Sequence, residues 1–266
     1  MRNLRRSKDP AAGEGFFTPA PPRVLAHRGL AVEAPENTLL AFAKAIAIGV
    51  THVETDVHVS ADGVAMISHD PDLRRVAGRA ATVAHLTSHE LRRIDLGAGQ
   101  SYCSLAEALD AFPETRFNID IKIAGAVLPT IEAVRSANAV RRVLIGSFHP
   151  RRRLAAVRML PGVATSISSR GALAAVAAAS TGSRAALQRI LRDVQAVQLP
   201  PSVLRMKPFS PRAVAAFHAA GVEVHAWTIN DVEVMEQLLE AGVDGLITDR
   251  ADLAMPVVQG RASKAS

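Results

Sequence analysis

The sequence contains very little sulfur and few aromatic rings. Cys103 is the only cysteine in 266 residues, so the chain cannot form an internal disulfide, and one thiol cannot build a zinc site by itself. Only 4% of the residues are aromatic, which leaves no series of rings on which the bases of a single-stranded nucleic acid would stack. We therefore expect no nucleic acid partner, although the formal net charge is +6.

Long apolar runs are also missing. No stretch reaches the roughly 20 consecutive apolar residues of a membrane span, and the basic N-terminus is followed by Asp9–Gly15 rather than by the apolar core of a secretory signal. We therefore expect a cytoplasmic protein without stable membrane insertion. No linker interrupts the middle of the chain, so we expect a single domain over residues 22–255, with flexible tails at 1–21 and 256–266.

What the sequence does contain is a regular alternation of short β-rich runs and helical patterns. Repeated strand–helix units of this kind are typical of a parallel sheet covered by helices. About eight of them in one domain favour a closed (β/α)8 TIM barrel. The predicted strands are 23–28, 52–59, 64–68, 117–122, 143–148, 163–168, 194–199, 222–228 and 245–248, and the predicted helices are 37–48, 105–111, 126–137, 171–192, 211–220 and 232–241.

The nine predicted strands exceed the eight of a barrel, and a hairpin explains the extra one. Asp62-Gly63 lies between two β-rich runs, and Asp-Gly in this position is a strong signal for a two-residue hairpin loop. With these two residues as the loop, the register places Asp56 opposite His69. Directly opposed residues have Cβ atoms about 4.5–5.5 Å apart, so the hairpin is expected to bring a histidine beside a carboxylate.

The predicted strand His52–Val59 carries two acidic residues on one face. Glu54 and Asp56 are two residues apart, so both carboxylates point the same way, while Val57 and Val59 occupy the other face. A solvated outer face is the alternative, but strands of a parallel barrel are buried on both sides. Two carboxylates on one face repel each other unless a cation lies between them or one is protonated. We expect a cation, and oxygen ligands favour a hard ion, Mg²⁺ or Ca²⁺.

The predicted strand 117–122 repeats this pattern. Asn118, Asp120 and Lys122 share one face, and apolar residues take the other. Polar groups in line on a buried strand need partners. We expect Asp120 to be the third carboxylate of the metal site and Lys122 to contact a phosphate oxygen. The alternative is a structural Asp–Lys pair.

Two histidines follow predicted strands. His27-Arg28-Gly29 ends the first strand, and His69 ends the hairpin. An imidazole has a pKa near about 6.5, so one histidine can remove a proton while the other donates one; a structural role is the alternative for each. Arg28 can hold a phosphate with two donors. Gly29 either permits the turn or lets a phosphate approach the backbone.

The single tryptophan, Trp227, is a candidate for substrate binding. It shares a strand face with His225. If that face is directed into the barrel mouth, Trp227 forms a wall for the carbon skeleton of a substrate. Packing in the core is an equally good explanation of the sequence.

Seven segments of the chain resemble the glycerophosphodiester phosphodiesterase family. In chain order they are AHRG, APENTLLAF, VETDVHVSADGVAMISHDPDLRR, FNIDIK, GSFHP, HAWTIN and GVDGLITDR. They run from about residue 23 to 253 in the order that the family has them. Several motifs in order are specific, whereas any one of them would not be.

The resemblance implies a TIM barrel with a small insertion after the His-Asp motif, which fits the helix-poor stretch 71–104. It implies hydrolysis of glycerophosphodiesters to sn-glycerol 3-phosphate and an alcohol, with Ca²⁺ or Mg²⁺ as the cofactor. By motif it assigns catalysis to His27 and His69, the metal to Glu54, Asp56 and Asp120, and substrate or phosphate binding to Arg28, Lys122 and Trp227.

The chain departs from the family at one position of the metal site. The family commonly has glutamate where this chain has Asp120. Aspartate carries the same charge on a side chain that is one methylene shorter, so we expect catalysis to be retained. The metal would shift, or a water would fill the gap, because Mg²⁺ readily keeps waters.

Several alternatives stay open at this stage. The same chemistry on a lysophospholipid would need an apolar groove for the acyl chain, to which residues 199–204 could contribute. A non-catalytic barrel that only binds ligands is a second class, but such a protein should have lost part of this set of residues. The nucleophile is either water or the glycerol 2-hydroxyl, which would give a cyclic phosphate. The sequence does not assign which histidine is the acid.

Overall fold

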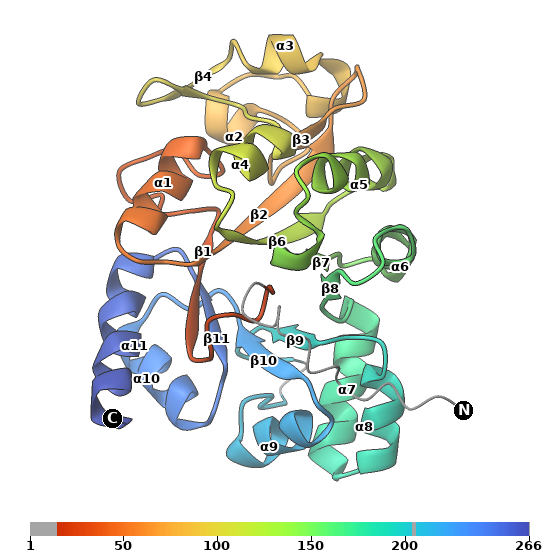
Figure 1. Ribbon diagram of the computed structural model, residues 1–266, viewed down its shortest axis with the longest axis vertical. Coiled ribbons are helices and arrows are strands. Elements are labelled where there is room, and N and C mark those ends of the chain that lie inside the picture. Colours follow the sequence, from red (N-terminus) through yellow and green to blue (C-terminus); the bar gives the residue numbers. More distant parts are fainter. Residues whose placement is uncertain (1–14, 204–205, 266) are drawn as a thin grey trace.

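The computed structural model describes residues 15–203 and 206–265 of the chain, and it confirms the barrel (Figure 1). Eight parallel strands follow the order β8-β7-β6-β2-β1-β11-β10-β9. The backbone N–H of Ile167 donates to the carbonyl of Ala196 at 3.1 Å, and that of Gln195 donates to Thr165 at 3.0 Å, which joins the two ends of the order. Their bounds are Arg23–His27 (β1), His52–Val59 (β2), Arg116–Ile121 (β6), Val143–Gly146 (β7), Ala164–Thr165 (β8), Ala196–Leu199 (β9), Glu223–Ala226 (β10) and Gly245–Thr248 (β11).

Helices cover the outside of the barrel. The apolar faces of strands and helices form two large clusters, one over β1 and β9–β11 and one over β2, β6 and β7. The bounds of the main helices are Leu39–Ala47 (α1), Leu105–Ala111 (α4), Val127–Ser136 (α5), Pro150–Met159 (α6), Ser169–Thr181 (α7), Arg184–Leu191 (α8), Pro211–Ala219 (α9), Val232–Glu240 (α10) and Ala251–Ala265 (α11). No helix in the described part of the chain is long and apolar enough to cross a membrane.

The structure differs from the predicted helices in three places. The segment 171–192 forms two helices, because Gly182 adopts φ +75° and ends α7. Helix α6 escaped prediction since its first turn is basic and only Arg153 and Ala156 are buried on it. Helix α11 continues through Pro256, although an internal proline removes a backbone donor and usually ends a helix.

The tail boundaries also differ from the expected ones. Phe16 lies within the predicted tail 1–21, yet its side chain is buried and packs edge-to-face on the ring of His52. Its carbonyl oxygen accepts a hydrogen bond from His52 Nε2 at 2.6 Å. Phe16 thus joins Leu25, Leu144 and neighbouring residues in a small apolar cluster of the barrel. Helix α11 likewise covers 256–265 of the predicted C-terminal tail, and residues 1–14 lie outside the described part.

The small insertion lies between β3 (Ala65–Ile67) and α4. It contains α2 (Arg74–Ala77), the 3-10 turn Val83–His85, α3 (Ser88–Leu91) and the short pair β4 (Asp95–Gly97) and β5 (Gln100–Ser101). These elements lie above one end of the barrel in Figure 1 and have an apolar cluster of their own, which includes Leu73, Leu91 and Tyr102.

The hairpin forms, but its predicted register is wrong by one residue. Strand β3 pairs antiparallel with β2 so that Val57 lies opposite Ile67. The loop has three residues instead of two, because Gly63 adopts φ +81° and donates its N–H to the carbonyl of Ser60 at 3.0 Å. A turn closed by a left-handed glycine is the usual form of a three-residue hairpin. Asp56 is therefore bonded through its backbone to Ser68, one residue before His69.

Candidate active site

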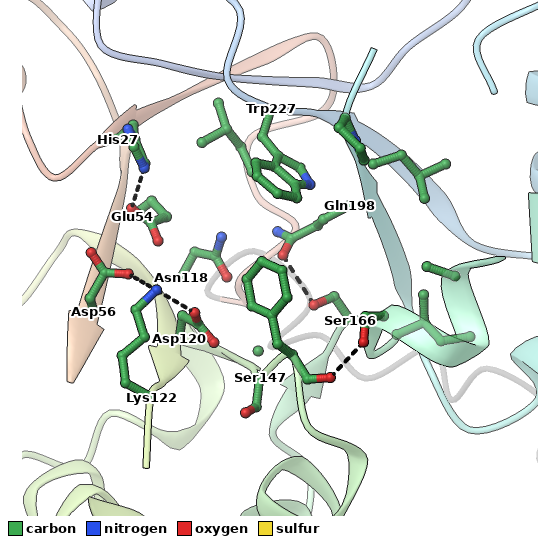
Figure 2. Close-up of a pocket in the computed structure, with 18 of the residues that line it drawn as sticks. His27, Glu54, Asp56, Asn118, Asp120, Lys122, Ser147, Ser166, Gln198 and Trp227 are labelled. Atoms are coloured by element: carbon green, nitrogen blue, oxygen red, sulfur yellow. Dashed lines mark hydrogen bonds and ion pairs between the residues drawn. The ribbon is translucent and has the colours of Figure 1, made fainter. Parts of the chain in front are cut away.

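A cavity of about 350 Å³ opens at the carboxyl ends of the barrel strands. Figure 2 shows charged side chains along one side of it and Trp227, Gln198 and Ser166 along the other. We call the first set the charged half; it consists of His27, Arg28, Glu54, Asp56, His69, Asp120 and Lys122. We call the apolar residues of the other side the apolar half; they are Phe148, Ile167, Ala172, Leu173, Leu199, Pro200, Val203 and Trp227.

The parallel register of the strands brings the charged half together. His27 at the end of β1 lies beside Glu54 on β2, and two residues further along β2 Asp56 lies beside Asp120 on β6. Lys122 Nζ lies between the two aspartates, 2.7 Å from Asp56 Oδ1 and 2.8 Å from Asp120 Oδ2 (Figure 2). The structure therefore places Lys122 in a carboxylate pair on the wall of the cavity.

Burial and the neighbouring charges shift the pKa values of the two carboxyl groups of β2 in opposite directions. Burial, together with the charge of Asp56, raises the pKa of Glu54 to about 8. Burial also acts on Asp56, but Lys122 and Arg28 outweigh it and hold the pKa of Asp56 below its usual value. Asp56 is thus a stable anion, whereas Glu54 has no comparable basic partner and its Oε2 atom is buried without a hydrogen bond.

His27 is held by a carboxylate that the sequence reasoning left without a role. Its Nδ1 atom lies 2.6 Å from Asp249 Oδ1, and Asn230 donates a hydrogen bond to the other oxygen of Asp249 at 2.8 Å. A carboxylate only accepts hydrogen bonds, so Nδ1 carries the proton and Nε2 is directed toward Glu54, 3.8 Å away. Burial opposes a charge on His27, but Glu54 and Asp249 raise its pKa.

His69 is oriented in the same way by its neighbour in the chain. Its Nδ1 atom lies 2.7 Å from Asp70 Oδ1, which leaves Nε2 to exchange a proton with a ligand. His58 Nε2 contacts the backbone oxygen of His69 at 3.3 Å. Although the register differs from the predicted one, His69 lines the same cavity as His27 and Asp56.

Arg28 and Gly29 turn the chain from β1 toward α1, with φ angles of 57° and 85°. A Cβ atom on Gly29 would lie 2.6 Å from the backbone carbon of Ala41, so the glycine serves the turn and close packing on α1. Arg28 Nε lies 3.2 Å from Asp56 Oδ2, and its Nη1 donates to Glu36 Oε1 at 3.0 Å. Arg28 thus lies on the cavity wall with carboxylates on two sides.

Trp227 fits both interpretations, because it lines the apolar half of the cavity and also packs against the small apolar cluster that contains Leu25 and Leu144. Trp227 packs edge-to-face on Phe148, with ring centroids 5.8 Å apart. Phe148 is 56% exposed, and Lys122 Nζ lies 5.8 Å from its ring centroid. Leu199 and Val203 from the segment 199–204 also line this half, while residues 204 and 205 lie outside the described part.

The three predicted metal ligands lie on one wall of the cavity, but their side chains are not close enough together to surround an ion. Within residues 15–203 and 206–265, no three His, Cys, Asp or Glu side chains are grouped so as to hold a metal ion. The donor chemistry nevertheless suits a hard cation, because Glu54, Asp56 and Asp120 offer only oxygen atoms. Glu54 Oε2 is buried without a hydrogen bond, and its ion-pair contact with His27 Nε2 is long, at 3.8 Å, so this oxygen is available to a cation.

Sequence reasoning missed the residues that hold the predicted ones in place. Asp249, Asp70 and Glu36 bind His27, His69 and Arg28 through hydrogen bonds or ion pairs, and Asn37 Nδ2 donates to Asp56 at 3.3 Å. All four lie inside motifs that carried the family resemblance. Their position in those motifs was the available signal, but which side chain each one contacts depends on the fold.

Comparison with known proteins gives consistent matches. A family model described as "Glycerophosphoryl diester phosphodiesterase family" matches residues 27–253. A Mycobacterium tuberculosis protein named "Probable glycerophosphodiester phosphodiesterase 2" is 44% identical over 239 residues, which cover 89% of this chain and 90% of that protein.

Solved structures match over similar lengths. The glycerophosphodiester phosphodiesterase from Thermotoga maritima has a TM-score of 0.70 at 26% identity and covers 88% of this chain and 97% of that one. A phosphodiesterase from Oleispira antarctica, solved in complex with the product sn-glycerol-3-phosphate, has a TM-score of 0.73 at 24% identity and covers 89% and 96%. The latter match shows a shared fold.

Proposed function

This chain belongs to the glycerophosphoryl diester phosphodiesterase family, and we propose that it hydrolyses glycerophosphodiesters to sn-glycerol 3-phosphate and an alcohol, using two histidines and one divalent cation. As a member of that family it is an enzyme of the phosphoric diester hydrolase class. One observation carries the proposal. Two histidines, each with Nδ1 on a carboxylate, line the same cavity as three further carboxylates.

The histidines supply the proton transfers. With Nδ1 held by Asp249 or Asp70, each ring presents Nε2 as its reactive nitrogen. One Nε2 removes the proton of the attacking hydroxyl, from water or from the glycerol 2-hydroxyl. The other Nε2 gives a proton to the departing alkoxide. If the 2-hydroxyl attacks, this step gives a cyclic phosphate, which water then opens to glycerol 3-phosphate. Proton transfer by positioned side chains contributes about 10²- to 10⁴-fold to a rate.

The basic residues bind the phosphate. Arg28 reaches the cavity from the β1–α1 turn, and its planar guanidinium can donate to two phosphate oxygens. Lys122 keeps its charge because, although burial disfavours it, Asp56 and Asp120 raise its pKa. Both cations lie on the cavity wall beside the histidines. A phosphoryl group bound there would develop negative charge during the reaction, and the two cations would stabilise that charge and so lower the barrier.

Glu54, Asp56 and Asp120 would hold the divalent cation, Mg²⁺ or Ca²⁺. When bound there, the cation supplies a Lewis acid for a phosphoryl oxygen and compensates the carboxylates. The Oε2 atom of Glu54, which is buried without a hydrogen bond, supports this assignment. Lys122 competes with the metal ion for Asp56 and Asp120. Because Asp120 is shorter than the usual glutamate, its side chain affects how tightly the site holds its ion.

A second candidate substrate is favoured by the apolar half. A lysophospholipid carries the same phosphodiester and an acyl chain, and eight apolar residues form the wall opposite the charges. Leu173 and Phe148 are large and partly exposed at that wall. Ligand sites of this size typically combine an apolar lining with a few polar groups that fix orientation.

Turnover of glycerophosphocholine by histidine variants tests the proposal. We expect wild-type protein with Mg²⁺ or Ca²⁺ to release glycerol 3-phosphate, and His27→Ala and His69→Ala each to lower kcat by about 10²- to 10⁴-fold. His218→Ala is the matched control, since His218 forms a similar pair with Asp244 at 2.7 Å and does not line the cavity. Near-normal turnover in either cavity variant would refute the histidine pair.

A further inference from the structure

Beyond the residues that line the cavity, we propose that Arg75 is a positioning residue, which fixes His69 and Arg28 from behind through two carboxylates. This inference rests on the proposed function, because it concerns the reactive orientation of those two side chains. Arg75 does not line the catalytic cavity. It belongs to α2 of the insertion, so it comes from a different part of the chain than the barrel strands.

One side of the Arg75 guanidinium holds the partner of His69. Arg75 Nε donates to Asp70 Oδ2 at 2.6 Å, and the other oxygen of Asp70 lies 2.7 Å from His69 Nδ1. The two bonds use different oxygens, so the plane of the Asp70 carboxylate is defined from both sides. Arg75 therefore determines where the hydrogen-bond acceptor of His69 lies, and with it the direction of Nε2.

The other side of the guanidinium holds the partner of Arg28. Nη1 and Nη2 of Arg75 form two parallel bonds with Glu36, at 2.8 Å and 2.7 Å. Glu36 Oε1 also accepts from Arg28 Nη1 at 3.0 Å. Two parallel bonds fix a carboxylate more strictly than one does, so Glu36 offers Arg28 a fixed point of attachment.

The space around these groups shows why packing alone would not hold them. A second cavity, of about 220 Å³, lies beside the network and is lined by Glu36, His69, Asp70 and Arg75 together with Leu96 and Tyr102. With this space adjacent, the carboxylates have room to rotate. Their orientation is therefore set by the arginine, which reaches both of them.

Only an arginine can make this set of contacts. Its Nε and its two terminal nitrogens point along different edges of one rigid plane, which lets it bind Asp70 with one edge and Glu36 with the other. Lysine has the same charge concentrated at one point and no such fork. If only the charge of Arg75 mattered, a lysine at this position would support turnover. If the geometry of the contacts matters, a lysine would not.

The network is also too exposed to act mainly through stability. The Arg75 side chain is 48% exposed, and ion pairs at such sites contribute little to folding because solvent screens them. Loss of Arg75 should therefore leave the melting temperature nearly unchanged. A loss of turnover without a loss of stability would point to positioning.

The experiment measures kcat and KM for glycerophosphocholine in Arg75→Gln and Arg75→Lys, with Arg74→Gln as the matched control for charge lost from the same helix. We expect both Arg75 variants to lose about 10- to 100-fold in kcat/KM at an unchanged melting temperature. Arg74→Gln should behave as wild type. A fully active Arg75→Lys, or an Arg75→Gln equal to the control, would overturn the proposal.

Double variants identify the route. If Arg75 acts through its two carboxylates, Arg75→Gln combined with Asp70→Asn or with Glu36→Gln should lose less than the product of the single losses. If the losses in kcat/KM of the single variants simply multiply in the double variants, Arg75 does not act through these carboxylates.

A spectroscopic measurement separates this proposal from the proposed function. In ¹⁵N-labelled protein, His69 should be the tautomer with its proton on Nδ1, and Arg75→Gln should shift it toward a mixture of tautomers. A wild-type protein that fails to hydrolyse glycerophosphocholine would refute the proposed function but leave this measurement valid. An unchanged His69 tautomer in Arg75→Gln would refute the positioning role.

Discussion

The two halves of the catalytic cavity are built from different strands and differ in chemistry. The charged half comes from β1, β2, β6 and the β3 hairpin, and its side chains are tied to one another by ion pairs such as Lys122 with Asp56. The apolar half comes from the segments that follow β7 to β10 and has aromatic and aliphatic side chains. Under the proposed function, the charged half carries out the reaction and the apolar half contacts the rest of the substrate.

If the proposed function is right, this difference separates reaction from substrate recognition within one barrel. Charges of the first half are mutually paired, so changing one of them disturbs several others. Apolar side chains of the second half, such as Leu173 and Phe148, are partly exposed and contact a ligand individually. Substitutions in the charged half should therefore abolish turnover, and substitutions in the apolar half should change the preference among substrates.

The largest expected effect comes from Asp56→Asn, which removes the buried anion that Lys122 and Arg28 share. Lys122 keeps Asp120 and Arg28 keeps Glu36 as partners, so the free energy of unfolding should fall by less than the about 3–5 kcal/mol of a fully unpaired buried charge, whereas the turnover should fall steeply. Denaturant unfolding and glycerophosphocholine assays measure these. Asp193→Asn is the control, because its pair with Arg192 is more than 70% exposed on both sides. If Asp193→Asn lowered turnover and stability as much as Asp56→Asn does, the special role of the charged half would be contradicted.

Metal removal should have the next largest effect and should act on the charged half alone. A chelator is expected to lower turnover by more than about 100-fold, since a metal ion supplies several kcal/mol of charge stabilisation. Added Mg²⁺ or Ca²⁺ should restore it. Full activity of protein whose metal content is shown to be zero would contradict the assignment of Glu54, Asp56 and Asp120.

A smaller effect is expected from Leu173→Gln in the apolar half. We expect kcat/KM for lysophosphatidylcholine to fall about tenfold, which is typical for one contact in an apolar pocket, and that for glycerophosphocholine to fall much less. Leu128→Gln is the control, because Leu128 is also an exposed helix leucine but lies outside the cavity. A parallel loss on both substrates would show that the two halves do not divide the work.

The last prediction concerns stability rather than turnover, in the barrel below both halves. Burial lowers the pKa of His52 from 6.5 to about 3, even though its bond to the Phe16 carbonyl favours protonation. Between these pH values the unfolded chain binds a proton that the folded chain excludes, so stability should fall as the pH falls from 6.5 toward 3. The slope from this residue is at most about 1.4 kcal/mol per pH unit.

Unfolding of wild type and His52→Gln at pH 4 to 7 checks this. The variant should show a weaker dependence on pH in that window. An unchanged slope would mean that other groups cause the acid sensitivity.

Periodicity in the sequence was enough to predict the strands and the carboxylate faces. Glu54 and Asp56 alternate with Val53, Thr55 and Val57 on β2, and the structure places both carboxylates on the cavity wall. Periodicity could not predict contacts between residues that are distant in the chain. Asp249 is 222 residues from His27, and the parallel register of β1 and β11 that brings them together is a property of the closed barrel.

Local chemistry explains the remaining differences. The register of the hairpin depended on whether the loop had two or three residues, and the left-handed Gly63 fits both types of turn. The phosphate contact of Lys122 stays a prediction, and the structure adds that its ammonium group pairs with Asp56 and Asp120. Such choices depend on distances between side chains, which a sequence pattern does not contain.

The most direct test is a crystal structure of the protein grown with Mn²⁺ and sn-glycerol 3-phosphate, with the metal located by its anomalous signal. The account predicts one ion bound by Glu54, Asp56 and Asp120, and a phosphate within hydrogen-bond distance of Arg28 and of both His27 and His69. An ion bound elsewhere, or a phosphate in the cavity without contact to either histidine, would contradict it.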